Sequence, residues 1–141
     1  GRVLELGGRE LQLQLSTFPP DAAGTRCPTG DAVITALSPS SMANRASPLS
    51  QNYKEIVHAV APLYGSPDWA FLLGRCYHQA LGLVYEAAAH HHPDISVASP
   101  LLGAGAKGTP VELAARIAAQ HCASWQHADS AMCMSDNNGR I

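Results

Sequence analysis

The sequence predicts an α/β domain in which helices cover a mostly parallel sheet. From residue 55 onward, short β-branched apolar runs alternate with longer runs of helical periodicity, in the order strand, helix, strand, helix, strand. This order corresponds to two βαβ units, which require parallel strands and right-handed crossovers. The 141 residues suffice for one ordinary core and show no internal repeat, so residues 1–141 are expected to form a single domain.

The first third of the chain is expected to contain a hairpin, one further strand and loops. The leucines of residues 11–15 alternate with glutamines after the Gly7-Gly8 pair, which is the pattern of a β-hairpin. Residues 31–37 (DAVITAL) form an apolar run that predicts a strand. The flanking residues 18–30 and 38–51 are rich in proline, glycine or serine and are expected to be loops.

The second part of the chain carries the alternation of strands and helices. The expected strands are residues 55–61 (EIVHAVA, ended by Pro62), 94–99 (DISVAS) and 130–134 (SAMCM), and the expected helices run from Ser66-Pro67-Asp68 to about His90 and over residues 109–126. Each helix has one apolar stripe, formed by Trp69, Leu72, Cys76, Ala80, Leu83 and Ala87 in the first and by Val111, Ala115, Ala118, Cys122 and Trp125 in the second.

Residues 99–108 (SPLLGAGAKG) place three glycines between an expected strand and an expected helix. Thr109 can cap that helix, Pro110 has no N–H to leave unpaired there, and Glu112 stands three residues after the cap. Free N–H groups at a helix start favour an anion, and glycine lets the backbone approach a ligand closely. A tight packing turn would use the same glycines, and the pattern alone leaves both readings open.

Composition excludes several functions. A net charge of −2 argues against broad electrostatic binding of nucleic acid or of an anionic membrane surface. No apolar run approaches the length of a membrane span and no secretory signal is found, although a chain that starts at Gly1 reads as part of something longer. Four scattered cysteines without a Cys-x-x-Cys pair indicate a reducing compartment, and we expect a cytoplasmic protein.

Metal and nucleophilic chemistry find little support. The histidine run at residues 90–92 ends a predicted helix, where three adjacent side chains do not face one point, so no metal site is expected. No Gly-x-Ser-x-Gly elbow is present, and no cysteine has a recognisable base. His58 in the middle of a strand is expected to be a buried, neutral histidine with one hydrogen-bond partner.

Three stretches together resemble one family. Residues 26–35 (RCPTGDAVIT), 53–62 (YKEIVHAVAP) and 99–108 resemble, in order, three segments of macro domains, with the closest likeness to the X domains of positive-strand RNA virus replicase polyproteins. Residues 72–88 resemble the helix that joins the last two, and the likeness covers about residues 26–134. The resemblance implies a three-layer α/β/α sandwich with a mixed, mostly parallel sheet.

The resemblance also implies a ligand and a setting. The ligand would be ADP-ribose or an ADP-ribosylated protein, with no cofactor, and the setting a larger polyprotein in the host cytoplasm. The diphosphate and distal ribose of ADP-ribose would be bound by Ser99, Pro100, Leu102, Gly103, Ala104, Gly105, Ala106, Lys107 and Gly108. Candidates on the adenine side are Asp31, Asp136 and Asn137, since a carboxylate can accept from an exocyclic amine, although residues 136–139 also read as an ordinary turn.

Departures from the family pattern bear on catalysis. Hydrolytic members carry an Asn-Ala-Ala-Asn segment and a triple-glycine loop, and neither is found here. In one alignment Gly7-Gly8 is the remnant of that loop and the first strands are absent. In the other, residues 31–41 occupy the position of the family's strand and asparagine loop. The hairpin-like alternation of residues 3–15 favours a real N-terminal strand pair, whereas residues 27–33 (CPTGDAV) match the later family segment better, so both alignments stay open. Lys107 stands where members often carry an aromatic residue, and it could pair with phosphate.

Three functions follow from the resemblance. The first is ADP-ribose binding with hydrolase activity weak or lost, as the missing asparagine implies. The second is an active mono-ADP-ribosyl hydrolase, because that chemistry depends largely on positioning. The third is a degenerate fold that serves as a replicase scaffold or binds nucleic acid. The net charge of −2 does not favour nucleic-acid binding.

Overall fold

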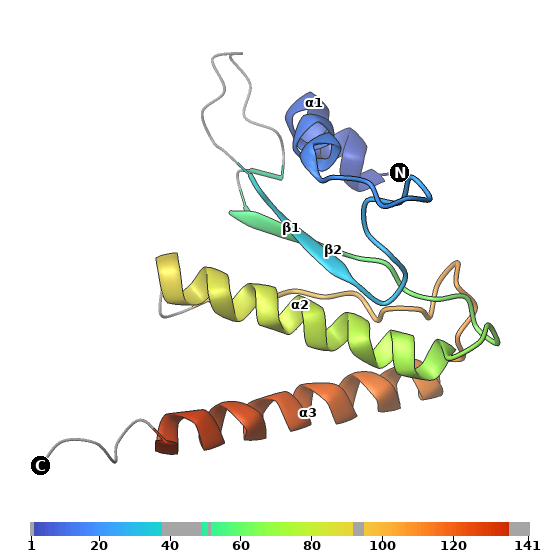
Figure 1. Ribbon diagram of the computed structural model, residues 1–141, viewed down its shortest axis with the longest axis vertical. Coiled ribbons are helices and arrows are strands. Elements are labelled where there is room, and N and C mark those ends of the chain that lie inside the picture. Colours follow the sequence, from blue (N-terminus) through green and yellow to red (C-terminus); the bar gives the residue numbers. More distant parts are fainter. Residues whose placement is uncertain (1, 38–48, 51, 92–94, 136–141) are drawn as a thin grey trace, which may run out of the picture.

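The protein is described by a computed structural model, which covers residues 2–37, 49–50, 52–91 and 95–135 (Figure 1). The elements within these residues are α1 (Arg2–Thr17), β1 (Ala32–Ala36), β2 (Glu55–Ala59), α2 (Trp69–His91) and α3 (Val111–Ser135).

The elements are arranged in layers. Figure 1 shows α1 on one side of the strand pair and α2 on the other, with α3 beyond α2. Helix α2 contacts both strands and α3, whereas α1 contacts β1. Helices on both sides of a sheet confirm the predicted α/β class.

The sheet differs from the expected one. Strands β1 and β2 are antiparallel, with Ala32 opposite Ala59 and Ala36 opposite Glu55. Antiparallel strands, unlike parallel ones, do not require a crossover connection between them. Within the described ranges the sheet has these two strands, so the expected parallel pairing is not seen there.

Two expected strands are not strands in the structure. Residues 95–100 are irregular and exposed, with Ile95 39% and Val97 56% accessible, and no strand among the described residues pairs with them. Residues 130–134 lie inside α3. That run contains no β-branched residue, and its alanine and methionines have high helix propensity, so it continues the preceding helix.

The expected N-terminal hairpin is also wrong, because this segment is helix α1, with a kink at Gly8 (φ 69°, ψ −165°). Leucine and glutamine both favour helix, and Leu11 is buried while Leu13 is 55% exposed, so the leucines do not share one buried strand face. Gln14 fastens α1 to the sheet: its amide Nε2 donates to the Ala36 carbonyl at 2.9 Å, and its Oε1 accepts from the Ala36 N–H at 3.1 Å. The observation that favoured an alignment with an N-terminal strand pair is therefore removed.

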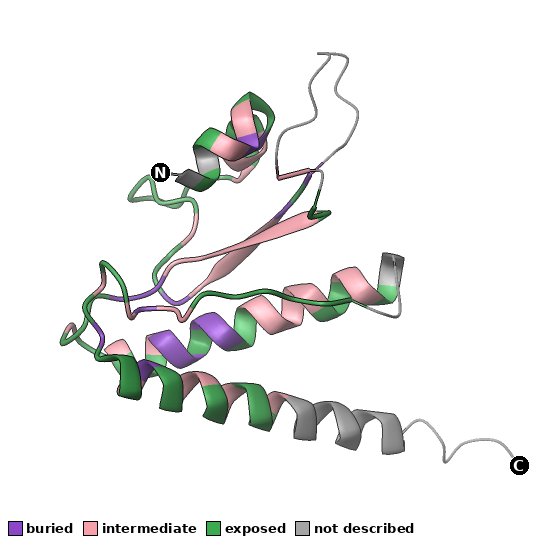
Figure 2. Cartoon of the chain, turned by 180° about the vertical axis from the view of Figure 1, so that it is seen from behind, coloured by how far each residue is buried: buried purple, intermediate pink, exposed green. Residues whose placement is uncertain are grey.

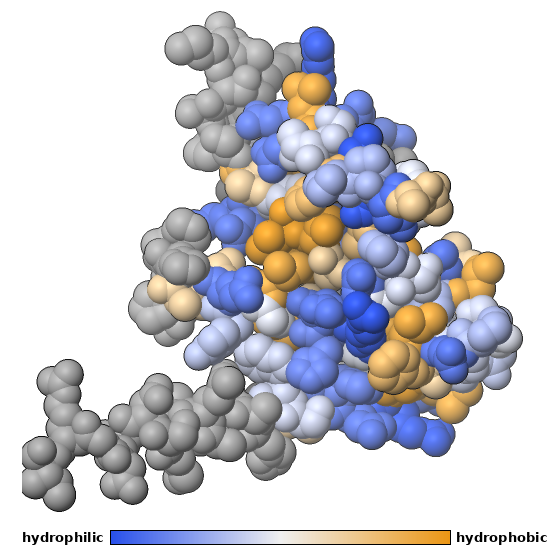
Figure 3. Space-filling view, in the orientation of Figure 1, coloured by the Kyte–Doolittle hydropathy of each residue, from blue (hydrophilic) through white to orange (hydrophobic). Residues whose placement is uncertain are grey.

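The core lies between α2, the end of β2 and the start of α3. Ala61, Leu73 and Tyr77 form its centre, and the partly buried hydrophobic residues Trp69, Leu102, Ile117 and Ala118 pack against it. Figure 2 shows the buried residues of α2 in the first half of that helix. In Figure 3 apolar side chains gather over the strand pair, below α1.

Helix α3 turns a different face to α2 than its sequence suggests. Val111, Ala115 and Cys122 of the expected stripe are exposed. The inward stripe instead consists of the buried Ala114 and the half-buried Ile117, Ala118, His121 and Trp125. Close approach to a glycine explains this choice, since a Cβ on Gly74 of α2 would lie 2.1 Å from Nε2 of His121.

His58 has a hydrogen-bond partner, as expected, but is half-buried rather than buried. Its Nε2 lies 2.9 Å from Oγ1 of Thr35 on the paired strand, and burial lowers the pKa of the imidazole below its ordinary value of 6.5. His58 is therefore interpreted as a neutral, hydrogen-bonded residue with a role in the fold.

Candidate functional site

The glycine-rich loop connects residues 95–100 to α3 and is fixed by two other elements. The N–H of Tyr64, just after β2, donates to the Lys107 carbonyl at 2.9 Å. The hydroxyl of Tyr77 on α2 accepts from the Leu102 N–H at 3.0 Å. The loop therefore lies where the carboxyl end of β2 and the starts of α2 and α3 come together (Figure 1).

Two glycines give the loop its path. Gly103 (φ 80°) and Gly108 (φ 78°) have left-handed backbone conformations, which side chains disfavour. Gly103 is also enclosed, because a Cβ there would lie 3.1 Å from Oγ1 of Thr109 and 3.2 Å from Cδ1 of Leu73. Internal bonds close the loop: the N–H of Gly108 donates to the Gly105 carbonyl, and that of Thr109 to the Gly103 carbonyl, both at 2.9 Å.

Three successive N–H groups at the tip of the loop remain available. Those of Gly105, Ala106 and Lys107 donate to no acceptor in the part of the chain that the structure describes. Gly105 and Ala106 are exposed, and a Cβ on Gly105 would meet nothing within 4 Å. Successive free N–H groups next to the start of a long helix favour an anion, because their dipoles and that of the helix add.

Lys107 adds a formal positive charge beside these groups. Its side chain is half-buried and makes no ion pair with any residue that the structure describes. The loop therefore offers backbone donors and an ammonium group to a phosphate, although the Gly108 N–H, expected to face the ligand, is used within the loop.

The Thr109 hydroxyl does not cap α3 as expected. Thr109 is 2% exposed, and its Oγ1 has no hydrogen-bond partner among the described residues. It lies beside Gly103 instead, and α3 begins with a bond from the Ala114 N–H to the Pro110 carbonyl at 3.0 Å.

The other candidate residues occupy different surroundings. Ser99 and Pro100 are exposed, and the Ser99 hydroxyl donates to the Pro100 carbonyl at 2.9 Å. Leu102 packs against the core, and Ala104 is half-buried in the loop. Asp136 and Asn137 lie outside the described residues.

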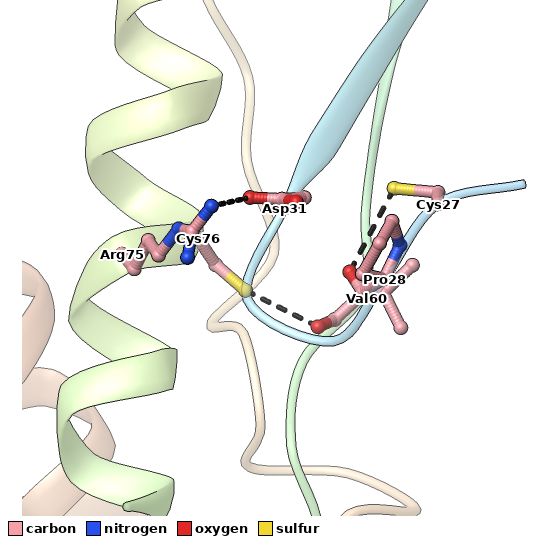
Figure 4. Close-up of polar contacts among 6 residues, drawn as sticks. All are labelled: Cys27, Pro28, Asp31, Val60, Arg75 and Cys76. Carbon is pink, nitrogen blue, oxygen red and sulfur yellow. Dashed lines mark hydrogen bonds and ion pairs between the residues drawn. The ribbon is translucent and has the colours of Figure 1, made fainter. Parts of the chain in front are cut away.

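Asp31 faces α2 and has a charged partner. Its Oδ1 lies 2.6 Å from Nη2 of Arg75, and Figure 4 shows the two side chains pointing at one another. This ion pair occupies one carboxylate oxygen, so Asp31 ties the start of β1 to α2 whatever else it contacts.

Cys27, Cys76 and Cys122 are free thiols, and Cys122 is exposed. The thiol of Cys76 is buried and donates to the Val60 carbonyl at 3.3 Å (Figure 4). Burial raises the pKa of Cys76, and burial and the Asp31 carboxylate raise that of Cys27. Both are protonated at neutral pH and are therefore poor nucleophiles.

Sequence reasoning missed Tyr64 and Tyr77, the two residues that hold the loop. Their contacts join positions distant in the chain, and no local pattern could have identified them. It also missed an open groove of about 330 Å³ between α2 and α3, lined by Phe71, Arg75, His78, Gln79 and His121. No residue of the glycine-rich loop lines that groove. Within the described residues there is no cluster of metal-ligating side chains, and no helix is both long and apolar enough to cross a bilayer.

Comparison with known proteins places this geometry in a family context. A family model described as Macro domain matches residues 2–118. A macro domain-containing protein of Xanthomonas axonopodis pv. citri is 29% identical over 128 residues, which are 89% of this chain and 63% of that protein. The solved macrodomain of Oceanobacillus iheyensis with ADP has a TM-score of 0.66 at 26% identity, over 86% of this chain and 57% of that one. A point mutant of it with ADPR has a TM-score of 0.64 at 28% identity, over 86% and 59%.

These relatives bear on two expectations. They are bacterial proteins, so the narrower likeness to viral replicase X domains, and with it a viral setting, is not supported. The chain spans about three-fifths of the length of the relatives it matches, from 57% to 63% in the first ones compared.

Proposed function

The chain belongs to the macro domain family, and from this premise we propose that it binds ADP-ribose, free or attached to a protein, through residues 99–108. The observation that carries the proposal is the run of three unpaired N–H groups at Gly105, Ala106 and Lys107. A diphosphate can accept from several such donors at once, and charge-assisted hydrogen bonds of this kind are stronger than neutral ones.

The surroundings of the loop support a diphosphate over a single carboxylate. The start of the 25-residue helix α3 contributes a positive dipole end, and Lys107 contributes a formal charge. The two solved relatives, described as having ADP and ADPR, carry ligands with this same diphosphate.

We further propose that hydrolysis of ADP-ribosyl groups is weak or absent. Removal of the ribose from a protein requires the sugar and an attacking water to be held in line. The residues that the structure describes contain a single asparagine, Asn52, in the loop before β2, and the family's asparagine segment is not found in the sequence. An active hydrolase would need another residue in its place, which makes it the second candidate.

Gly105 provides the sharpest test of binding. Open space surrounds the position of its missing Cβ, so Gly105→Val should leave the fold intact while its side chain covers the free N–H groups. The matched control is Gly82→Val, a glycine in α2 whose Cβ would likewise meet nothing within 4 Å. Isothermal titration with ADP-ribose should show binding to the wild type and the control and none to Gly105→Val.

The same proteins test catalysis. The wild type and Gly105→Val are each incubated with a mono-ADP-ribosylated protein. The wild type should release no more ADP-ribose than Gly105→Val does. If the wild type releases ADP-ribose and Gly105→Val does not, the second candidate function, an active hydrolase, is favoured instead. A wild type that does not bind ADP-ribose in titration would overturn the proposed function and leave a scaffold role.

A further inference from the structure

A half-exposed tyrosine is hydrogen-bonded to the loop at Lys107 and has no part in the function proposed so far. Tyr64 is 46% exposed and packs edge-to-face with Trp69, with ring centroids 4.8 Å apart and planes inclined by 69°. An edge-to-face contact leaves part of the tyrosine ring uncovered, and the 46% exposure of the residue makes that part available to a ligand.

The loop itself holds this ring in place. The N–H of Tyr64 donates to the carbonyl of Lys107 at 2.9 Å, and Lys107 also carries one of the free N–H groups. The Cβ of Tyr64 lies 4.0 Å from the position that a Cβ on Gly108 would take. The backbone after Tyr64 is folded into a turn, because Ser66 donates to the Leu63 carbonyl from both its N–H, at 3.2 Å, and its hydroxyl, at 2.7 Å.

The backbone and Cβ of an aromatic residue therefore lie directly beside Lys107 and Gly108, next to the anion donors of the loop. Binding sites for small molecules combine a few polar groups, which fix an anchor, with aromatic surface that covers the adjoining part of the ligand. A ligand anchored by its diphosphate at Gly105–Lys107 places the sugar bonded to that diphosphate next to the anchor. The C–H groups of a sugar ring can lie against an aromatic face, whereas a bare phosphate has no such surface.

We propose that Tyr64 is a specificity-determining residue of this site, whose ring packs against the sugar joined to the diphosphate. This inference rests on the proposed function, because it takes the loop as the diphosphate anchor. It predicts that the site distinguishes a sugar diphosphate from an inorganic diphosphate, and that the difference depends on the ring of Tyr64.

The test compares two ligands on four proteins. The wild type, Tyr64→Ala, Tyr64→Phe and Tyr85→Ala are titrated with ADP-ribose and with inorganic pyrophosphate, and the amide shifts of Gly105–Lys107 are followed by NMR, which also measures millimolar dissociation constants. Tyr85 is a matched control, because it is 50% exposed and packs edge-to-face with Trp125 at 5.5 Å, but lies in α2.

Tyr64→Ala should weaken ADP-ribose binding about tenfold and change pyrophosphate binding less than twofold. Tyr64→Phe, which keeps the ring, and Tyr85→Ala should bind both ligands as the wild type does. Unchanged ADP-ribose affinity in Tyr64→Ala would overturn the inference while leaving the proposed function intact. Equal losses for the two ligands would also overturn it, because Tyr64 would then act only by holding the loop. A wild type that binds neither ligand would overturn the proposed function as well.

Discussion

Removal of one hydroxyl group tests whether α2 holds the glycine-rich loop. In Tyr77→Phe the acceptor of the Leu102 N–H is lost, while the ring that packs in the core remains. Tyr77 is 7% exposed and Leu102 half-buried, so water reaches the freed N–H only in part. Leaving a buried donor unpaired costs about 1–3 kcal/mol, and the partial exposure of Leu102 favours the lower end, about 1–1.5 kcal/mol.

Chemical unfolding measures this loss directly. With a urea dependence of about 2 kcal/mol per molar, the midpoint should fall by roughly 0.5–0.8 M. The matched control is Tyr85→Phe, which removes the hydroxyl of a half-exposed tyrosine on the same helix and should leave the midpoint unchanged. Burial raises the pKa of Tyr77, so its hydroxyl stays protonated and the difference should be the same at pH 7 and pH 9.

The loop should also lose part of its preorganisation. If Leu102 is released, the N–H groups of Gly105–Lys107 are held less firmly, and ADP-ribose binding should weaken together with stability. A Tyr77→Phe protein with the wild-type urea midpoint would refute the assignment of Tyr77 as the residue that anchors the loop.

Three further changes have defined outcomes. Lys107→Ala should weaken ADP-ribose binding by up to about tenfold at low salt, with the gap closing as ionic strength rises; equal affinities at low salt would place the ammonium in solvent. The pKa of His58 is lower in the folded protein than the unfolded value of 6.5, so the unfolded state binds the proton first and stability falls as the pH drops below about 7. In His58→Gln, urea midpoints at pH 7.5 and 5.5 should differ less than in the wild type, and an equal difference would contradict this assignment. Thr109→Val replaces a buried hydroxyl that has no partner among the described residues and should raise the unfolding free energy by about 1 kcal/mol, whereas a loss of stability would show that the hydroxyl is paired.

The elements that could be predicted are those whose evidence is local. Strands β1 and β2 and helix α2 fall within or close to the predicted ranges, because each combines a consistent period with a clear stop such as Pro62. The start of α3 could be placed from Thr109-Pro110 even though the Thr109 side chain does not cap it.

The errors arise where one pattern fits two structures. Leu11 and Leu15 would share one face of a strand. Because they are four residues apart, they would also share one face of a helix. Tertiary contacts decided between the two, since Leu11 is buried and Gln14 pairs with the edge of β1. Residues 95–100 show the opposite case, a strand-like sequence without a paired neighbour in the described part of the sheet.

The candidate site divides in the same way. The glycines could be predicted, because a turn that approaches a ligand needs backbone conformations that only glycine adopts readily, and Gly103 and Gly108 have them. The tyrosines could not, because a contact between Tyr77 and Leu102 spans 25 positions and depends on how α2 lies across the sheet. A sequence can therefore indicate which backbone takes the conformations of a glycine-rich loop, while the residues that hold this loop in place emerge only from the fold.

The two kinds of residue make different demands on variation. Gly103 and Gly108 are constrained by their own φ angles, so almost any side chain at either position distorts the loop. Tyr64 and Lys107 are joined through backbone atoms, from the Tyr64 N–H to the Lys107 carbonyl, and this bond persists whatever side chains the two positions carry. Their side chains can therefore change without loss of this backbone bond, and under the proposed function we expect the specificity of the site to reside at these two positions.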